Sequence, residues 1–288
     1  MRTINELARK EKIDTRKMCK YFDISKSGYY ASLKKEEKDM LNTEIILKLV
    51  QEKRTKMPRV GCKKLYFDLY EKLQDIEKIG RDKFISILRD NDLLVNIKRK
   101  YVKTTNSRHR FYKYNNLLYD KTLTIPNECW VADITYIRTV NKFLYLSLLT
   151  DAYSRKIVGW YLSNSLSIEG CLQTLKMALK QRKSKTPLIH HSDRGIQYCS
   201  NEYVNLLEKN SIDISMTEQN HCYENAIAER VNGILKNEFL LDSTFKNYDQ
   251  CYKAVKEAIE TYNNERPHWS LGLKTPTQVH DQKYNIAG

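Results

Sequence analysis

The sequence predicts an α/β protein: a mixed five-stranded sheet flanked by helices, with basic all-α modules ahead of it. Three β-rich runs separated by short turns, at 131–137, 143–149 and 156–162, indicate a meander of three strands. Helices and strands alternate after the third run, which is the order expected of a sheet with helices on its faces. The 288 residues are enough for more than one domain.

The elements after the meander can be placed one by one. A helix is expected over 168–182, a short apolar strand over 188–190 and a second helix over 201–209. The last strand is expected over 212–216, and the chain beyond it is predicted to be helical. These two strands bring the predicted sheet to five.

The chain before the meander is predicted to begin with short helices. Residues 3–33 show this pattern, and Asp14-Thr15 can cap one of the helices. Residues 24–30 indicate a turn followed by an N-capped helix. The pattern fits a helix-turn-helix whose second helix lies in a DNA major groove, and it fits any small three-helix bundle equally well.

Three further helices are predicted from apolar residues at helical spacing. Their apolar positions are Leu41, Ile45, Ile46 and Leu49; Leu65, Leu69 and Leu73; and Phe84, Ile85 and Leu88. Basic residues lie between these positions, as they would on an ordinary solvated surface or on one that binds DNA.

Positive charge is concentrated in the first part of the chain. The net charge is +15; residues 1–115 contain 30 Lys+Arg and 16 Asp+Glu, whereas 116–288 contain 20 and 19. Residues 96–114 lack apolar periodicity and interleave basic side chains with tyrosines, so we interpret them as an extended basic linker. This distribution indicates a part that holds a polyanion, joined to a charge-balanced part with another task.

Cysteine usage and hydropathy limit the class of protein. The seven cysteines are scattered without a C-x-x-C pair, so we expect reduced thiols rather than disulfides or a zinc site. The chain has no run of about 18 apolar residues and no signal-like start. We therefore expect a cytoplasmic, nucleoid-associated protein without a membrane segment.

Three carboxylates stand out by their positions. Asp133 lies in the middle of the first predicted strand, Asp193 ends the strand that begins at Leu188, and Glu229 lies on a predicted helix over 224–239. An ionised aspartate within a covered sheet is costly unless it is paired, hydrogen-bonded or bound to metal. Carboxylates without His or Cys partners favour Mg²⁺ or Mn²⁺ over zinc, and two such ions can support phosphoryl transfer.

The predicted helix that carries Glu229 has two different sides. Its apolar stripe consists of Ile227, Val231, Ile234 and Leu235. Asn225, Glu229 and Lys236 fall on the opposite side, and the last two are two helical turns apart. A helix buried by the stripe would present a carboxylate and a cation that could bind a phosphate, although an ordinary solvated face has the same pattern.

Several sequence blocks resemble those of a known family. WVADITYI (130–137), HHSDRGIQY (190–198) and ENAIAERVNGILKNEF (224–239) are similar to the three catalytic blocks of DDE transposases and retroviral integrases, in spacing as well as in residues. YNNERPH (262–268) and SKSGYY (25–30) are similar to blocks of the second-frame product of insertion-sequence-three transposases. The resemblance runs over nearly the whole chain, in the family's order.

The resemblance implies an RNase H-like catalytic domain that binds two divalent ions, Mg²⁺ or Mn²⁺, through Asp133, Asp193 and Glu229. It implies a DNA transposase that cleaves the ends of an insertion sequence and joins them to target DNA, without a covalent enzyme intermediate. The partners implied are the terminal inverted repeats, the target DNA, further copies of the chain on DNA, and a protein from an upstream frame.

Other residues are expected to contact DNA. The resemblance implies that Lys236 lies near the scissile phosphate. The remaining candidates are Arg194, Asn225, Arg230, Arg266, Lys98, Arg99 and Lys100. We expect such contacts to be made mostly with the DNA backbone, and sequence recognition to come from the N-terminal helices.

On this basis the chain divides into five expected parts. They are a helix-turn-helix-like segment (1–36), a basic helical DNA-binding domain (37–95), a basic linker (96–125), the RNase H-like integrase core (126–240) and a C-terminal helical extension (241–288).

Two other functions fit parts of the pattern. A plain nuclease of the same fold would hydrolyse DNA without ever joining it. A DNA-binding regulator with a vestigial catalytic centre would bind DNA without strand chemistry, and the three intact carboxylates argue against it.

Overall fold

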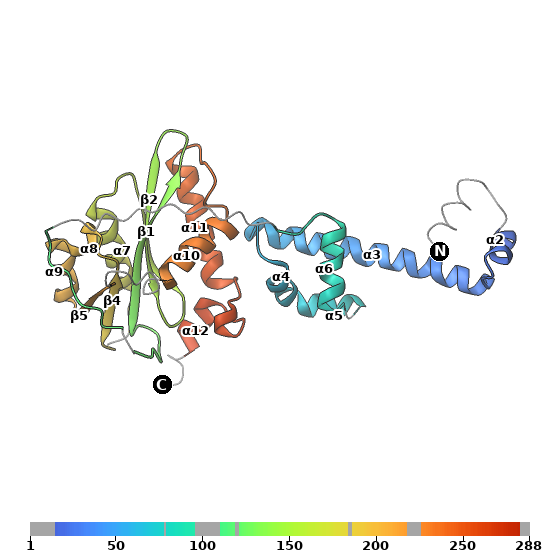
Figure 1. Ribbon diagram of the computed structural model, residues 1–288, viewed down its shortest axis with the longest axis horizontal. Helices are drawn as coiled ribbons and strands as arrows, with labels where there is room; N and C mark the ends of the chain where they lie inside the picture. Colours follow the sequence, from blue (N-terminus) through green and yellow to red (C-terminus); the bar gives the residue numbers. More distant parts are fainter. Residues whose placement is uncertain are drawn as a thin grey trace. The chain divides into compact units, whose positions relative to one another are not determined.

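The chain forms two compact units in the computed structural model (Figure 1). The residues described are 15–77, 79–95, 110–118, 121–183, 186–217 and 226–282. The first unit comprises Met1–Lys53 with Leu65–Leu94, and the second comprises Arg54–Lys64 with Val95–Gly288. Residues 96–109 and 119–120 of the expected basic linker lie outside the described part of the chain.

The N-terminal part is helical. Its helices are α2 (Thr15–Tyr21), α3 (Lys26–Lys56), α4 (Cys62–Asp68), α5 (Tyr70–Glu77) and α6 (Arg81–Asp90). The core of the first unit contains Ile46, Val50, Leu65, Leu69, Leu73, Phe84 and Leu88, each at most 1% exposed. The predicted core positions Leu65, Leu69, Leu73, Phe84 and Leu88 are therefore confirmed, whereas Ile85 is only half-buried. The single helix predicted around Leu65, Leu69 and Leu73 is divided into α4 and α5, with Leu69 between them.

The turn before α3 agrees with the sequence. Ser25 precedes the helix, and its Oγ accepts a hydrogen bond from Gly28 N at 3.0 Å, which satisfies one N–H group of the first turn. The helix is 31 residues long, so it extends past residue 36, where the helix-turn-helix-like segment was expected to end. No proline or glycine interrupts residues 29–56, so the sequence contains nothing that stops the helix there.

The buried face of helix α3 differs from the face that the sequence predicts. Asn42, Ile46 and Val50, four residues apart, are buried, whereas Leu41 and Ile45 are 58% and 39% exposed. Residues one position apart on a helix point about 100° away from each other, so a core built on Ile46 and Val50 excludes their neighbours.

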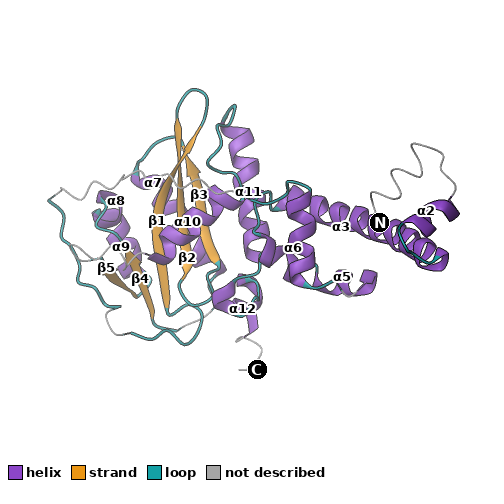
Figure 2. Ribbon diagram, turned by 45° about the vertical axis from the view of Figure 1, so that its right-hand side comes forward, coloured by secondary structure: helices purple, strands orange, loops and turns teal. Residues whose placement is uncertain are grey.

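The second unit contains a five-stranded mixed sheet in the order β3-β2-β1-β4-β5 (Figure 2). The strands are β1 (Cys129–Arg138), β2 (Phe143–Asp151), β3 (Ile157–Ser163), β4 (Leu188–Ser192) and β5 (Ile212–Met216). The pairs β1–β2 and β2–β3 are antiparallel, whereas β1–β4 and β4–β5 are parallel. The predicted meander and the predicted mixed sheet are confirmed.

Helices flank this sheet. They are α7 (Ile168–Gln181), α8 (Ile196–Cys199), α9 (Asn201–Lys209), α10 (Ala226–Glu238), α11 (Tyr248–Asn264) and α12 (Pro276–Gln282), with a 3₁₀ turn, η1 (Trp269–Leu271). α7 lies so close to β3 that a Cβ at Gly159 would collide with the carbonyl oxygen of Thr174. None of the helices described in either unit combines the length and apolarity that a bilayer span requires.

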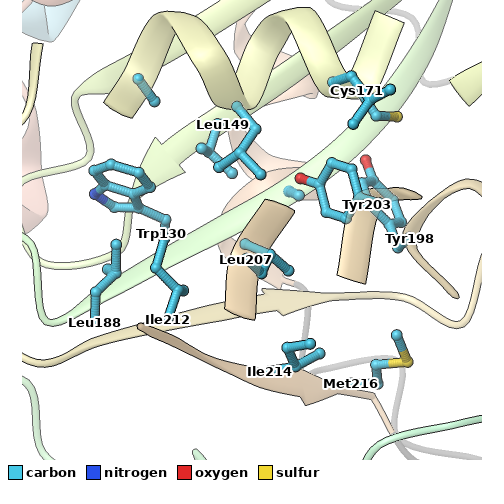
Figure 3. Packing of buried hydrophobic residues seen from close by; sticks show 14 of the residues in the cluster. Trp130, Leu149, Cys171, Leu188, Tyr198, Tyr203, Leu207, Ile212, Ile214 and Met216 are labelled. Carbon is cyan, nitrogen blue, oxygen red and sulfur yellow. The ribbon is translucent and has the colours of Figure 1, made fainter. Parts of the chain in front are cut away.

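Strand β1 sends alternate side chains to opposite faces of the sheet. Trp130 and Ala132 belong to the large core cluster that also contains residues of α7, α8 and α9 (Figure 3). Cys129 and Val131 belong to a second cluster, in which Ala228 of α10 packs. Asp133 is two residues beyond Val131, and side chains two apart on a strand share a face. Asp133 therefore faces α10.

Candidate active site

Asp133 lies on β1, and Asp193 directly follows the neighbouring strand β4. The parallel pairing of β1 with β4 aligns Cys129 with Ile189 and Val131 with His191. The same register continued by two residues places Asp133 opposite Asp193, which directly follows the last residue of β4. Neighbouring strands are about 4.8 Å apart, so the two carboxylates share one face within reach of a common ligand.

The Asp133 carboxylate is held by two hydrogen bonds. Its Oδ1 accepts from Ile134 N at 2.9 Å, and its Oδ2 accepts from Asn232 Nδ2 of α10 at 2.6 Å. One bond comes from the strand itself and the other from the helix that covers it. The carboxylate is therefore fixed at both oxygens.

The pKa of Asp133 reports the surrounding charges. It is raised to about 7, chiefly because burial disfavours the ionised carboxylate and then because Asp193 is negative; the charge of Glu229 adds a smaller increase. The hydrogen bonds from Asn232 and Ile134 oppose the increase without cancelling it. A cation bound beside Asp133 would offset the burial and the neighbouring negative charges that raise the pKa of this carboxylate.

A tight turn positions Asp193. Its Oδ1 accepts a hydrogen bond from Gly195 N at 3.0 Å, just before α8 begins at Ile196. A Cβ at Gly195 would lie 2.9 Å from the same oxygen, closer than side chains tolerate. The glycine therefore allows the carboxylate to fold back over the turn.

Helix α10 contributes Glu229 and Lys236, as the sequence predicts. Val231, Ile234 and Leu235 of the expected stripe are buried. Glu229 is exposed in the first turn, and Lys236 lies two turns further on. Burial lowers the pKa of Lys236, and the negative charge of Asp133 opposes this decrease, which indicates that the ammonium group lies within electrostatic range of the carboxylate.

Within the part of the chain that the structure describes, no three His, Cys, Asp or Glu side chains form a group that could hold a metal ion. The two aspartates are aligned, but Glu229 does not join them in such a group. The chemistry of the carboxylates nevertheless fits a hard cation, because their ligand atoms are oxygens. Asn232 Oδ1 is a further buried oxygen, and it has no hydrogen-bond partner among the described residues.

The candidate DNA contacts fall into three groups. Arg230 is exposed on α10, and Arg194 is half-buried next to Asp193. Arg266 is 2% exposed, and its Nε and Nη2 donate to Glu238 at 2.7 and 2.8 Å, so an internal ion pair replaces the expected DNA contact. The remaining candidates, Asn225, Lys98, Arg99 and Lys100, lie outside the described residues.

Sequence reasoning missed Asn232. This residue is three positions after Glu229 and contacts Asp133 directly, on the side of α10 that the sequence assigned to Glu229 and Lys236. Its spacing from Glu229 was a usable signal, since residues three apart on a helix are neighbours. The residue type was not a usable signal, because an asparagine on a polar helix face is usually solvated.

Comparisons with known proteins point to one family. Two family profiles, both described as Integrase core domain, match residues 124–222 and 210–276. An uncharacterized 31 kDa protein of insertion element IS600 from Shigella sonnei is 36% identical over 276 residues, 94% of this chain and 100% of that protein. Transposase InsF for insertion sequence IS3fB from Escherichia coli strain K12 is 34% identical over 197 residues, 68% of each chain.

Solved structures give a weaker likeness. The HTLV-2 integrase catalytic core domain in complex with magnesium, in its trimeric form, is 23% identical with a TM-score of 0.44. The match covers 54% of this chain and 97% of that domain.

The sheet topology and the two profile matches define a protein with an integrase core domain, and the predicted RNase H-like fold class is confirmed. More narrowly, the chain belongs to the IS3-family transposases, since it matches relatives at 34% and 36% identity over two thirds or more of their length. This membership places it among the proteins of DNA transposition and integration.

Proposed function

We propose that this chain is a DDE-type transposase, a polynucleotidyl transferase that cleaves the ends of its insertion sequence and joins them to target DNA with Mg²⁺ or Mn²⁺. The observation that carries the proposal is the parallel register of β1 and β4, which pairs Val131 with His191 and, continued by two residues, would bring Asp133 next to Asp193. The influence of Glu229 and Asp193 on the pKa of Asp133 supports it, because the same three carboxylates carry the family resemblance.

Each part of the site has a task in this mechanism. Asp133, Asp193 and Glu229 would hold the divalent ions through carboxylate oxygens, and Lys236 would bind a phosphate oxygen of the DNA. Bound Mg²⁺ or Mn²⁺ supplies charge neutralisation at the scissile phosphate and stabilises the leaving oxygen. Water attacks the phosphodiester at the element end, and the freed 3′-hydroxyl attacks a second phosphodiester, so no side chain has to act as a nucleophile.

The proposed partners are the terminal inverted repeats and target DNA. The basic N-terminal part, with its surplus of Lys and Arg, would hold the DNA backbone. Two element ends have to meet for joining, so we propose that several copies assemble on DNA, with an upstream-frame protein as a further partner.

The test compares wild type, Asp193→Asn and Asp213→Asn on a duplex that carries the terminal repeat. Asp213 is exposed on β5, so its substitution makes the same chemical change away from the site. We expect Asp193→Asn to lower cleavage and joining by about a thousandfold, the scale of several kcal/mol that a metal contributes. Binding of end DNA should persist in both variants.

Three outcomes would contradict the proposal. Near-full activity of Asp193→Asn with Mg²⁺ would remove this carboxylate from the reaction. Nicked products that are never joined would indicate a plain nuclease. If wild type binds DNA equally well with and without metal and neither cleaves nor joins it, the protein would be a regulator with a vestigial catalytic centre.

A further inference from the structure

Asn232 is the residue of α10 that touches Asp133. Its Nδ2 donates to Asp133 Oδ2 at 2.6 Å, while Asp133 Oδ1 accepts from Ile134 N at 2.9 Å. An ionised carboxylate can only accept hydrogen bonds, so the amide has to present its NH₂ group to Asp133. Bonds at both oxygens fix the rotation of the carboxylate.

The other end of the amide is buried and unpaired. Asn232 is 7% exposed, and its Oδ1 has no hydrogen-bond partner within the described part of the chain. Asn127 is also buried, but its Oδ1 accepts from Trp130 Nε1 at 3.0 Å. An unpaired buried carbonyl is costly, and a native protein that keeps one calls for an explanation.

The position of Asn232 on α10 also connects this residue to the proposed site. It lies one turn after Glu229 and one turn before Lys236, on the same side of the helix. Ile234, which is buried, lies on the opposite side. Asn232 is thus where the helix that carries Glu229 and Lys236 is bonded to the strand that carries Asp133.

We propose that Asn232 is a positioning residue of the divalent-metal site: it holds the Asp133 carboxylate in place beside Asp193 and offers its Oδ1 to the water shell of the cation. This inference rests on the proposed function, since it assigns Asn232 to the same site. Each Asp133 oxygen keeps a lone pair for the cation after accepting one hydrogen bond. Partners of this kind commonly change metal affinity by about 10- to 100-fold.

A purely structural role makes a different prediction. If Asn232 only joins α10 to β1, its replacement should lower stability and leave metal affinity unchanged. The decisive quantity is therefore the affinity of the DNA-free protein for Mn²⁺, which requires neither catalysis nor knowledge of the element end.

The experiment measures Mn²⁺ binding by isothermal titration calorimetry on the full chain. Asn232→Leu retains the side-chain volume without a donor, and Asn232→Ser retains polarity with a reach too short for Asp133. Asn237→Ala is the matched control, because Asn237 lies on the same helix but points about 140° away from Asn232. We expect the Kd for Mn²⁺ to rise about 10- to 100-fold in both Asn232 variants and to stay unchanged in the control.

The outcomes separate this inference from the proposed function. Wild-type Mn²⁺ affinity in either Asn232 variant overturns the positioning role, as does loss of the fold in both. Asp193→Asn, titrated in parallel, reports on the metal site itself. If wild type binds Mn²⁺ and Asp193→Asn does not, the proposed metal site is supported, independently of the result for the Asn232 variants. If wild type and Asp193→Asn have the same affinity for Mn²⁺, both the proposed function and the role of Asn232 are contradicted.

Discussion

At the scale of single residues, Asp133 shows how the burial of a carboxylate lowers the stability of the fold. Its pKa in the fold is about 7, whereas an aspartate in an unfolded chain has a pKa of about 3.9. The folded protein thus holds this proton more tightly than the unfolded chain does. Stability falls as the pH rises from about 4 through 7, and the loss is complete above pH 7.

Asp133→Asn should therefore stabilise the metal-free protein while it abolishes activity. Each pKa unit corresponds to about 1.4 kcal/mol, so the gain in unfolding free energy should be about 1.5 kcal/mol at pH 5 and about 4 kcal/mol at pH 8. Urea unfolding at both pH values, with metal removed, measures the difference. Asp213→Asn serves as the exposed control. An advantage of Asp133→Asn that is independent of pH would contradict this account.

Residues differ in how far the sequence reveals their roles. Asp133 and Asp193 could be singled out because a charge within a strand, or at its end, is unusual enough to need a reason, and their catalytic role stays a prediction. Arg266 was misjudged because its partner Glu238 is 28 residues away in the chain, and nothing local shows that the two meet. Asn232 was missed because its burial depends on a strand nearly 100 residues earlier.

At the scale of elements, α10 is held firmly at its C-terminal end. Its last residue, Glu238, accepts hydrogen bonds from Arg266 and, at 3.0 Å, from Lys64 Nζ. Burial alone would raise the pKa of Glu238, but the hydrogen bond and charge of Arg266, with help from Lys64, lower it overall. Hydrogen bonds thus connect the helix that carries Glu229 to Arg266, which follows α11, and to Lys64.

Arg266→Leu should destabilise the protein by about 3–5 kcal/mol, because it leaves Glu238 buried with only Lys64 as a partner. Chemical denaturation measures this loss. Lys253→Leu is the control, since its side chain is 79% exposed. Below the unfolding transition, the affinity of Arg266→Leu for DNA should equal that of wild type. Unchanged stability with weakened DNA binding would instead restore Arg266 as a DNA contact.

Elements were predictable where their pattern is local. The strands of the meander follow from β-rich runs bounded by turns, and each falls within a few residues of its predicted range. The inward face of α3 was not predictable, because Leu41, Ile45 and Ile46 are all apolar and only contacts with other helices decide which of them is buried. Local sequence thus determines the type of element more firmly than its orientation.

At the scale of the whole molecule, the surplus positive charge and the proposed catalytic residues lie in different parts of the chain. Residues 1–115 carry nearly all of the surplus positive charge. The aligned aspartates and the integrase core matches lie beyond residue 123. The five-part division of the chain stays a prediction, and DNA affinity offers a direct way to test its basic linker.

Replacing Lys98, Arg99 and Lys100 by Gln should weaken DNA binding and also reduce its salt dependence. Each phosphate contact contributes about 0.9 to the slope of log affinity against log salt concentration, so losing three contacts should lower the slope by nearly three. Fluorescence anisotropy with a labelled duplex, over a series of KCl concentrations, measures both quantities.

The control for this prediction replaces Lys246, Lys253 and Lys256 by Gln, which removes the same charge from the exposed surface at and around α11. Lys253 and Lys256 each lie one turn before a glutamate on that helix. If phosphate contacts at the linker determine the slope, only the Lys98, Arg99 and Lys100 variant changes it. Equal changes in both variants would mean that DNA responds to the total charge of the chain, because long-range attraction does not depend on where a lysine lies.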